Sequence, residues 1–298
     1  VQTCALPISV LMLKAKAAYD EYGDDAARRI FKQKRLAMPW SEEGGEIVST
    51  TEVSDYLKAD DWDKEAVITP RAKVADRDGA PTGSIPFRTM GVDVQRGHFW
   101  VVVRRWSKTG HSRLMAFAKV DTWGNVEAFG KQYGIHKAMV MVDSGDNTTE
   151  VYRETAKRGW KCAKGSGSDD FAVTDRDGNT TRRFYSEKQR IVVPGLPAKA
   201  ELIVWSNLAG KDLLHGLRSR KVFTFAKDSG PDYVDQINAE VRVKDKRTGK
   251  PHWILPQGKK DNHALDCELL ALLAAVRWGI AGRESSETDL PTDANPAT

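Results

Sequence analysis

The chain has 298 residues, of which 40% are hydrophobic and 29% charged, and its formal net charge is +5 at pH 7. This balance predicts a globular protein with one large domain and a smaller appendage, and it excludes collagen-like, coiled-coil and disulfide-scaffold proteins. The sequence contains no apolar run long enough for a membrane-spanning helix, and its few scattered cysteines predict a reducing, cytoplasmic location. The positive charge permits a polyanionic partner such as nucleic acid without requiring one.

The N-terminal part differs in character from the rest of the chain. Residues 1–8, VQTCALPI, resemble the in-frame translation of a sequencing adapter, so we interpret them as an artefact and expect the natural chain to begin upstream. The alternative is an ordinary, poorly ordered N-terminus. Residues 10–38 show two helical patterns, and residues 39–86 are polar and proline-containing with little periodicity. We therefore predict a short helical and linker arm over residues 9–86.

From Arg88 onward the pattern predicts a mixed sheet. RTMGVDV, FWVVVRRW and SRLMAFAKV are separated by tight glycine-containing turns, which is typical of an antiparallel meander. A helix is expected at about residues 123–133, then the buried strand KAMVMVD, then an amphipathic helix within SGDNTTEVYRETAKRGW. The order β-β-β-α-β-α is that of the ribonuclease H-like fold, an α/β fold with a mixed sheet flanked by helices.

The later segments alternate between loops and helices. Residues 165–200 are predicted to form a long loop or a small hairpin insertion. Residues 201–218 are predicted to form a helix, and residues 239–255 a hairpin. NHALDCELLALLAAVRWG is apolar almost all round, which is typical of a helix buried in a core. We predict a ribonuclease H-like domain over residues 87–282. Residues 283–298, where apolar residues are scarce, are predicted to form a disordered tail.

Three carboxylates lie in otherwise apolar sequence. Asp93 ends the first strand, Asp143 ends the buried strand, and Asp266 lies in the apolar C-terminal helix. A buried carboxylate needs a compensating charge or hydrogen bonds, and a cluster of them would repel itself. Two divalent cations, Mg²⁺ or Mn²⁺, would satisfy such a cluster and are suited to phosphodiester hydrolysis.

Each acid taken alone also has an ordinary structural interpretation. Asp143 precedes Ser144-Gly145 and could cap the next helix, and Asp93 could initiate a turn. Asp266 is harder to explain in this way, because Asp is a poor residue within a helix. His263 lies one turn before Asp266 on the same helical face, where it could orient a water, contact a metal or cap the helix.

Three motifs together resemble the large terminase subunit of tailed bacteriophages, of the lambda-like GpA type. They are GVDVQ, VDSGDNTTEVY and NHALDCELLALLAA, and the upstream FKQKRLAMPW resembles the segment joining the ATPase to the nuclease of that family. The resemblance covers about residues 20–280. It implies the ribonuclease H-like nuclease domain, which cuts concatemeric viral DNA during packaging. The sequence has no G-x-x-x-x-G-K-[ST] phosphate loop, which agrees with a missing ATPase domain.

The resemblance also implies roles for individual residues. Asp93 matches the first-strand acid expected to bridge both metals, Asp143 the second acid and Asp266 the acid of the C-terminal helix. His263 matches an auxiliary catalytic position, and Asp146 is the second candidate for the position of Asp143. The implied partners are double-stranded DNA, the small terminase subunit, the portal and procapsid and the missing ATPase domain. The implied location is the host cytoplasm.

Contacts to DNA are less well defined by the sequence. The basic residues expected near the cleft are Arg96, Lys164, Arg182, Arg183 and Lys188. Solvated surface charges are the alternative interpretation for each of them. At the level of function, another ribonuclease H-like nuclease or recombinase and a catalytically inactive capsid- or DNA-docking module are the alternatives to the terminase nuclease.

Overall fold

The computed structural model describes residues 53–68, 84–174, 178, 180–245, 248–258 and 261–281. The expected helices of residues 10–38, the interpreted artefact at residues 1–8 and the tail at residues 283–298 lie outside these ranges. Among the described residues, none of the helices combines the length and the hydrophobicity that crossing a membrane requires.

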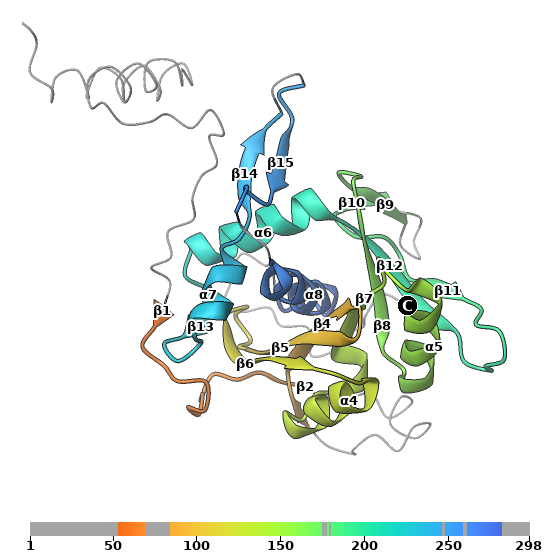
Figure 1. Cartoon of the computed structure of the whole chain (residues 1–298), viewed down its shortest axis with the longest axis horizontal. Helices are drawn as coiled ribbons and strands as arrows, with labels where there is room; N and C mark the ends of the chain where they lie inside the picture. Colours follow the sequence, from red (N-terminus) through yellow and green to blue (C-terminus); the bar gives the residue numbers. More distant parts are fainter. Residues whose placement is uncertain are drawn as a thin grey trace, which may run out of the picture.

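The centre of the molecule is a nine-stranded mixed sheet built from the described residues (Figure 1). From edge to edge its strands are β1 (Val53–Ser54), β13 (Phe223–Ala226), β6 (Ser112–Val120), β5 (His98–Trp106), β4 (Arg88–Gln95), β7 (Val140–Asp143), β8 (Lys161–Ser166), β12 (Ala200–Ser206) and β11 (Gln189–Ile191). β4, β5 and β6 are antiparallel neighbours, and β7 and β8 extend the sheet parallel to β4. This confirms the predicted meander and the ribonuclease H-like mixed sheet.

Helices cover both faces of this sheet. α8 (His263–Arg277) packs against β4, β5 and β7, whereas α4 (Trp123–Gln132) and α5 (Thr148–Arg158) lie over the opposite face (Figure 1). The two faces enclose separate hydrophobic cores, one containing the apolar residues of α8 and the other Val126 and Val151. A central strand covered on both faces must be apolar throughout, and β4 is accordingly buried at every position except its two ends.

α8 lies close against β4 because of a glycine. A Cβ atom at Gly91 would overlap the carbonyl group of Cys267 and approach within 3.0 Å of the Ala271 nitrogen. From Ala264 to Ala275 every residue of α8 is buried except Asp266. The helix is therefore the buried helix that its sequence predicts, and the one position in this stretch that is not fully buried is the acid of the candidate site.

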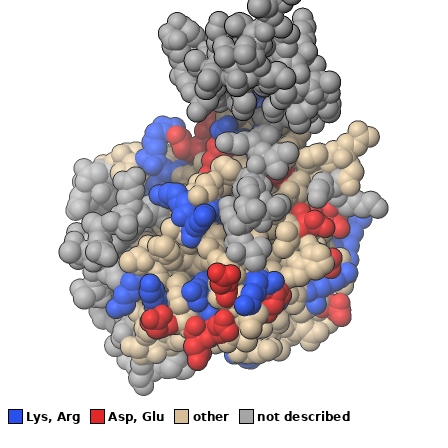
Figure 2. All heavy atoms as spheres, turned by 90° about the vertical axis from the view of Figure 1, so that its left-hand side faces the viewer, with Lys and Arg blue, Asp and Glu red and all other residues tan. Residues whose placement is uncertain are grey.

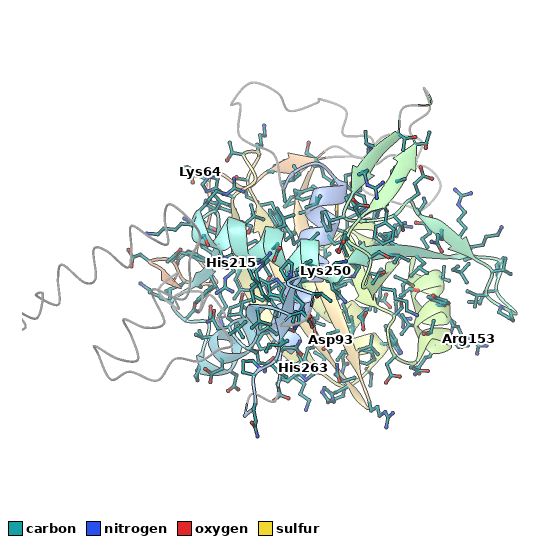
Figure 3. The ribbon with its side chains drawn as sticks, turned by 90° about the horizontal axis from the view of Figure 1, so that it is seen from above. Lys64, Asp93, Arg153, His215, Lys250 and His263 are labelled. Carbon is teal, nitrogen blue, oxygen red and sulfur yellow. The ribbon has the colours of Figure 1, made fainter. Side chains whose placement is uncertain are left out.

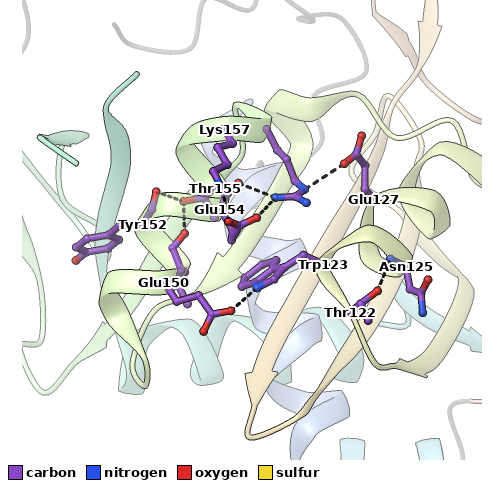
Figure 4. Close-up of polar contacts among 11 residues, drawn as sticks. Thr122, Trp123, Asn125, Glu127, Glu150, Tyr152, Glu154, Thr155 and Lys157 are labelled. Atoms are coloured by element: carbon purple, nitrogen blue, oxygen red, sulfur yellow. Dashed lines mark hydrogen bonds and ion pairs between the residues drawn. The ribbon is translucent and has the colours of Figure 1, made fainter. Parts of the chain in front are cut away.

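Polar contacts join α4 and α5 on the other face (Figure 4). The Trp123 indole nitrogen donates to Glu150 at 2.8 Å, and the Arg158 guanidinium bridges Glu127 and Glu154. α5 follows the turn after β7, so these contacts help to fix the turn that comes directly after Asp143.

The remaining elements surround this centre. They are β2 (Val67–Ile68), β3 (Ile85–Pro86), η1 (Lys137–Met139), β9 (Phe171–Thr174), β10 (Thr180–Arg183), α6 (Asn207–Ser219), α7 (Pro231–Ile237), β14 (Val241–Lys244) and β15 (Pro251–Ile254). β9 and β10 form a small hairpin within the insertion, and β14 and β15 form the hairpin predicted over residues 239–255.

The helix predicted over residues 201–218 is wrong in its first part. Residues Ala200–Ser206 form β12, which pairs with β8 and β11, and only Asn207–Ser219 form the helix α6. The short apolar run ELIVW fits either structure, and pairing on both sides of the strand decides the outcome. The Ser206 side chain caps α6 by accepting a hydrogen bond from the Ala209 nitrogen at 3.2 Å.

Part of the segment predicted as a linker belongs to the folded unit. Within residues 53–68, β1 pairs with β13, and Tyr56 and Ala66 are buried. The Tyr56 hydroxyl donates to the Thr224 carbonyl at 3.2 Å and accepts from the Leu114 nitrogen at 2.8 Å. Isolated buried positions of this kind produce no periodic pattern, which is why the sequence gives no signal for them.

Candidate active site

Asp93 lies near the C-terminal end of β4 and is 4% exposed. Its carboxylate accepts hydrogen bonds from Gln95 Nε2 at 2.9 and 3.1 Å and lies 2.7 Å from His263 Nδ1. Figure 3 shows Asp93 and His263 next to each other. The strand therefore supplies a buried acid that is held by its own strand and by the start of α8.

Asp143 ends β7, the parallel neighbour of β4. Val92 and Val142 are register partners, so Asp93 and Asp143 are the next residues along two adjacent strands. Burial and, after it, the charge of Asp93 raise the pKa of Asp143 to about 6, against backbone N–H groups of Gly145 and Ser144 that lower it. The raised pKa indicates that the two carboxylates repel each other across the strand pair.

Asp266 lies in the first turn of α8. Its pKa is raised to about 7, first by burial and then by the charges of Asp93, Glu240 and Asp143, against the nearby Lys211, which lowers it. Each of the other two acids thus acts electrostatically on Asp266. The three acids come from separate elements, β4, β7 and α8, and their charges act on one another.

The three acids lie on the same side of the sheet. Alternate residues of a strand share a face, so Asp93 faces the same side as Gly91, which touches α8. Asp143 shares its face with Met141, which belongs to the core that contains α8. As the side chains stand, no group of three His, Cys, Asp or Glu donors among the described residues surrounds a common point closely enough to hold a metal ion.

His263 is positioned by contacts on three sides. Besides Asp93, its ring stacks on Trp100 at a centroid distance of 5.6 Å, and its Nε2 lies 3.7 Å from Asp261 Oδ1. The hydrogen bond with Asp93 raises the His263 pKa above its usual 6.5, although partial burial acts in the opposite direction. Trp100 also stacks on Phe117 at 5.0 Å, so it serves as packing beneath the histidine.

Asp146, the second candidate for the position of Asp143, is exposed in the turn before α5. Its Oδ1 accepts from the Asn147 nitrogen at 3.0 Å, and Arg96 lies 3.9 Å from its Oδ2. Its charge reaches Asp143, where it contributes to the raised pKa. Asp143 is the more buried of the two and lies directly beside β4.

Two of the predicted DNA-contacting residues lie near the acids. Arg96 follows β4 in the turn to β5, and its side chain is 96% exposed. Lys164 is exposed on β8, one residue after Ala163, the register partner of Asp143.

The other three lie in the insertion and are partly engaged elsewhere. Arg182 forms an ion pair with Asp170, Lys188 lies 2.9 Å from Glu201, and Arg183 is half-buried on β10. On the face shown in Figure 2, basic and acidic side chains lie interspersed, so the net charge of +5 does not gather there into one basic surface.

Three further polar residues of the site were not predicted from the sequence. Gln95 donates to Asp93, and the Glu240 carboxylate lies 2.6 Å from Lys211 Nζ and 2.8 Å from Asn262 Nδ2. Gln95 lies two residues after Asp93 on the same strand face, and that spacing could have identified it. Glu240 and Lys211 come from separate segments, and only the tertiary fold brings them beside Asp266.

A family model and a solved structure are similar to this chain. The family model "Terminase large subunit gpA, endonuclease domain" matches residues 8–286. A solved structure, the large terminase nuclease from thermophilic phage G20c, is similar with a TM-score of 0.41 and 11% identity, over 77% of this chain and 98% of that chain. No curated protein matches the chain. Because the family model spans most of the sequence, the chain belongs to the endonuclease-domain family of the gpA-type terminase large subunit.

Proposed function

We propose that this chain is a metal-dependent endonuclease that cuts concatemeric viral DNA during genome packaging. Membership of the family assigns it to the DNA-cutting nucleases of phage terminases. The observation that carries the finer proposal is the coupling of Asp93, Asp143 and Asp266, which come from three elements on one side of the sheet.

The chemistry of these donors fits divalent cations. Two of the three carboxylates have pKa values raised by burial and by their acidic neighbours, so a cation would relieve a repulsion that the fold imposes. All-oxygen donors suit Mg²⁺ or Mn²⁺. When bound, two such ions would activate the attacking water and stabilise the leaving oxygen of the phosphodiester.

The three acids would have different roles in holding these ions. Asp93 acts electrostatically on both other acids and is the candidate to contact both ions, whereas Asp143 and Asp266 would each hold one. His263 and Gln95 fix the Asp93 carboxylate through hydrogen bonds. Lys211 offsets part of the negative charge around Asp266 and is itself held by Glu240.

The same proposal includes the wider partners of the domain. The substrate is double-stranded DNA in the cytoplasm of the host, and the partners are the small terminase subunit, the portal and procapsid and the ATPase domain. Arg96 and Lys164 are the predicted phosphate contacts that lie nearest the acids in the fold. Arg182, Arg183 and Lys188 would act farther out, on the insertion.

Cleavage of supercoiled plasmid tests the proposal. The 298-residue chain is incubated with plasmid and Mn²⁺ or Mg²⁺, beside Asp93→Asn and beside Asp121→Asn, which removes an exposed acid after β6. We expect metal-dependent nicking that EDTA abolishes, that Asp121→Asn retains and that Asp93→Asn lacks. Equal nicking by the parent and Asp93→Asn would overturn the assignment. A folded parent that neither cuts nor binds Mn²⁺ would instead support a docking module.

A further inference from the structure

A second concentration of charge lies away from the acids, in a cavity of about 270 Å³. Its walls come from the segment before β2, from the turn between β5 and β6, and from the start of β13. We call it the basic pocket, defined by the side chains of Lys64, His111, Arg113 and Lys221. No carboxylate is among its lining residues in the described part of the chain.

The basic pocket lies at the far end of the sheet from the acids. Asp93 pairs with Trp100 near the start of β5, whereas Ser107 of the pocket follows the end of that strand. Seven residue steps of strand, at about 3.3 Å each, separate the two places by roughly 23 Å. Figure 3 likewise shows Lys64 on the other side of the molecule from Asp93.

The cations of the basic pocket are not neutralised by described carboxylates. Among the described residues, no ion pair joins Lys64, Arg113 or Lys221 to an acid. The Arg113 guanidinium instead lies over the rings of Tyr56 and Trp62, at 4.6 and 4.9 Å from their centroids. Stacking fixes the position of this guanidinium and leaves its N–H groups free of a carboxylate partner.

Hydroxyl groups supply further donors beside these cations. Ser107 Oγ and Thr109 Oγ1 lie 2.9 Å apart, and Ser107 Oγ also accepts from the His111 nitrogen at 3.1 Å. One hydroxyl hydrogen serves the contact between Ser107 and Thr109, so the other is available to an acceptor in the cavity. Cations and hydroxyl donors without acids form the setting in which phosphate oxygens bind.

Lys221 adds an independent observation from the backbone. It follows α6 with a φ of 58°, in the left-handed region where glycine is normally found after a helix. A side chain at such a position is unfavourable for the backbone, and strained positions of this kind gather at functional sites.

We propose that the basic pocket binds a phosphate group of the DNA backbone, away from the phosphate that is cut. This inference rests on the proposed nuclease function. The distance of roughly 23 Å corresponds to about seven base-pair steps of B-form DNA, at 3.4 Å per step. A duplex whose scissile phosphate lies at the acids thus makes a second contact at the basic pocket, and this contact does not depend on the DNA sequence.

The competing occupant is acidic protein. Residues 284–298 contain Glu284, Glu287, Asp289 and Asp293 and no Lys or Arg. The described chain ends at Ala281, whose Cα would lie 3.9 Å from a Cβ placed on Gly110, in the turn that lines the pocket. DNA is the occupant that the family supports, and the experiment separates the two.

The experiment compares two doubly substituted chains, each also carrying Asp93→Asn to prevent cutting. Lys64→Gln/Lys221→Gly removes two pocket cations, and the glycine suits the left-handed backbone, so the thermal midpoint should not fall. Lys131→Gln/Lys157→Gln removes two exposed cations from α4 and α5 as a matched control. Binding of a 40-base-pair duplex is measured by fluorescence anisotropy across a salt series.

We expect the pocket variant to bind at least fivefold more weakly than its parent and to lose about one unit of salt slope. The control should change less than twofold. Equal weakening in both chains would overturn the proposal, as would no weakening in the pocket variant while its parent binds DNA. If the pocket substitutions weaken DNA binding only after residues 284–298 are deleted, the acidic segment is the occupant and the proposal is wrong. If the Asp93→Asn parent does not bind DNA and the unsubstituted chain does not cut it, the proposed function itself is contradicted.

Discussion

His263 Nδ1 lies 2.7 Å from Asp93 Oδ2, and this contact joins the first residue of α8 to the central strand β4. The hydrogen bond raises the pKa of His263, so the contact stabilises the fold most when the imidazole is charged. That contribution is complete below the unfolded-state pKa of about 6.5 and is lost as the pH rises through the higher folded-state value.

We therefore expect His263→Gln to destabilise the metal-free chain by about 1 kcal/mol at pH 5.5 and by less at pH 8.5. Urea unfolding in EDTA at the two pH values measures this. His252→Gln, at an exposed position on β15, is the control and should have little effect at either pH. A loss for His263→Gln that grows with pH would contradict the assigned contact.

Asp266 should oppose folding when it is ionised. Its pKa rises from 3.8 to about 7, first through burial and then through its acidic neighbours, so the folded state holds a proton that the unfolded state releases. Stability therefore falls as the pH rises from about 4 to about 7. We expect Asp266→Asn to raise the metal-free unfolding free energy by about 1–3 kcal/mol at pH 8, and the gain should vanish near pH 4. The same variant should not cut DNA. Destabilisation at pH 8 by thermal and urea unfolding would contradict this prediction.

Gly91 should control the distance between α8 and β4. A Cβ atom there would overlap the Cys267 carbonyl, so Gly91→Ala must move the helix that carries Asp266 and His263. We expect a loss of about 3 kcal/mol in urea unfolding, and weaker metal-dependent nicking in the fraction that still folds. Gly167→Ala adds its methyl group where no atom lies within 4 Å and is the matched control. Similar stability of the two variants would show that the close approach is unimportant.

A buried ion pair between Arg104 of β5 and Glu268 of α8 should help to hold α8 against the sheet. Arg104 and Glu268, both with fully buried side chains, lie 2.6 Å apart, and the Tyr233 hydroxyl also donates to Glu268. Glu268→Ala would leave the arginine charge buried without its partner, so we expect a loss of about 3–5 kcal/mol. Asp170→Ala breaks the exposed pair with Arg182 and should lose far less stability, because water screens that pair. Comparable losses, measured by urea unfolding, would contradict the importance assigned to burial.

The sequence predicts the acids of the site better than their surroundings. Asp93, Asp143 and Asp266 are conspicuous because each lies in an apolar run, and the sequence patterns place Asp93 and Asp143 at strand ends and Asp266 within a helix. Glu240 and Lys211 lie in ordinary polar sequence, and only the packing of α6 beside α8 brings them to Asp266. Local pattern carries no information about such contacts.

The sequence likewise predicts some elements of the fold better than others. The meander, the buried strand β7 and α8 follow from apolar runs that are long or bounded by clear turns. Residues 201–206 were predicted as helix because a short apolar run has no distinct period, and the pairing partners of β12 are remote in sequence. The buried Tyr56 and Ala66 likewise depend on a sheet edge formed by later strands.

Binding of Mn²⁺ to the metal-free chain tests the central claim most directly. Isothermal titration calorimetry at pH 8 should show two ions bound per parent chain and per Asp121→Asn control. Asp93→Asn should lose most of the binding, because Asp93 is the acid that lies beside both other carboxylates. Undiminished Mn²⁺ binding by Asp93→Asn, or a folded parent that binds none, would contradict a metal site built on Asp93, Asp143 and Asp266.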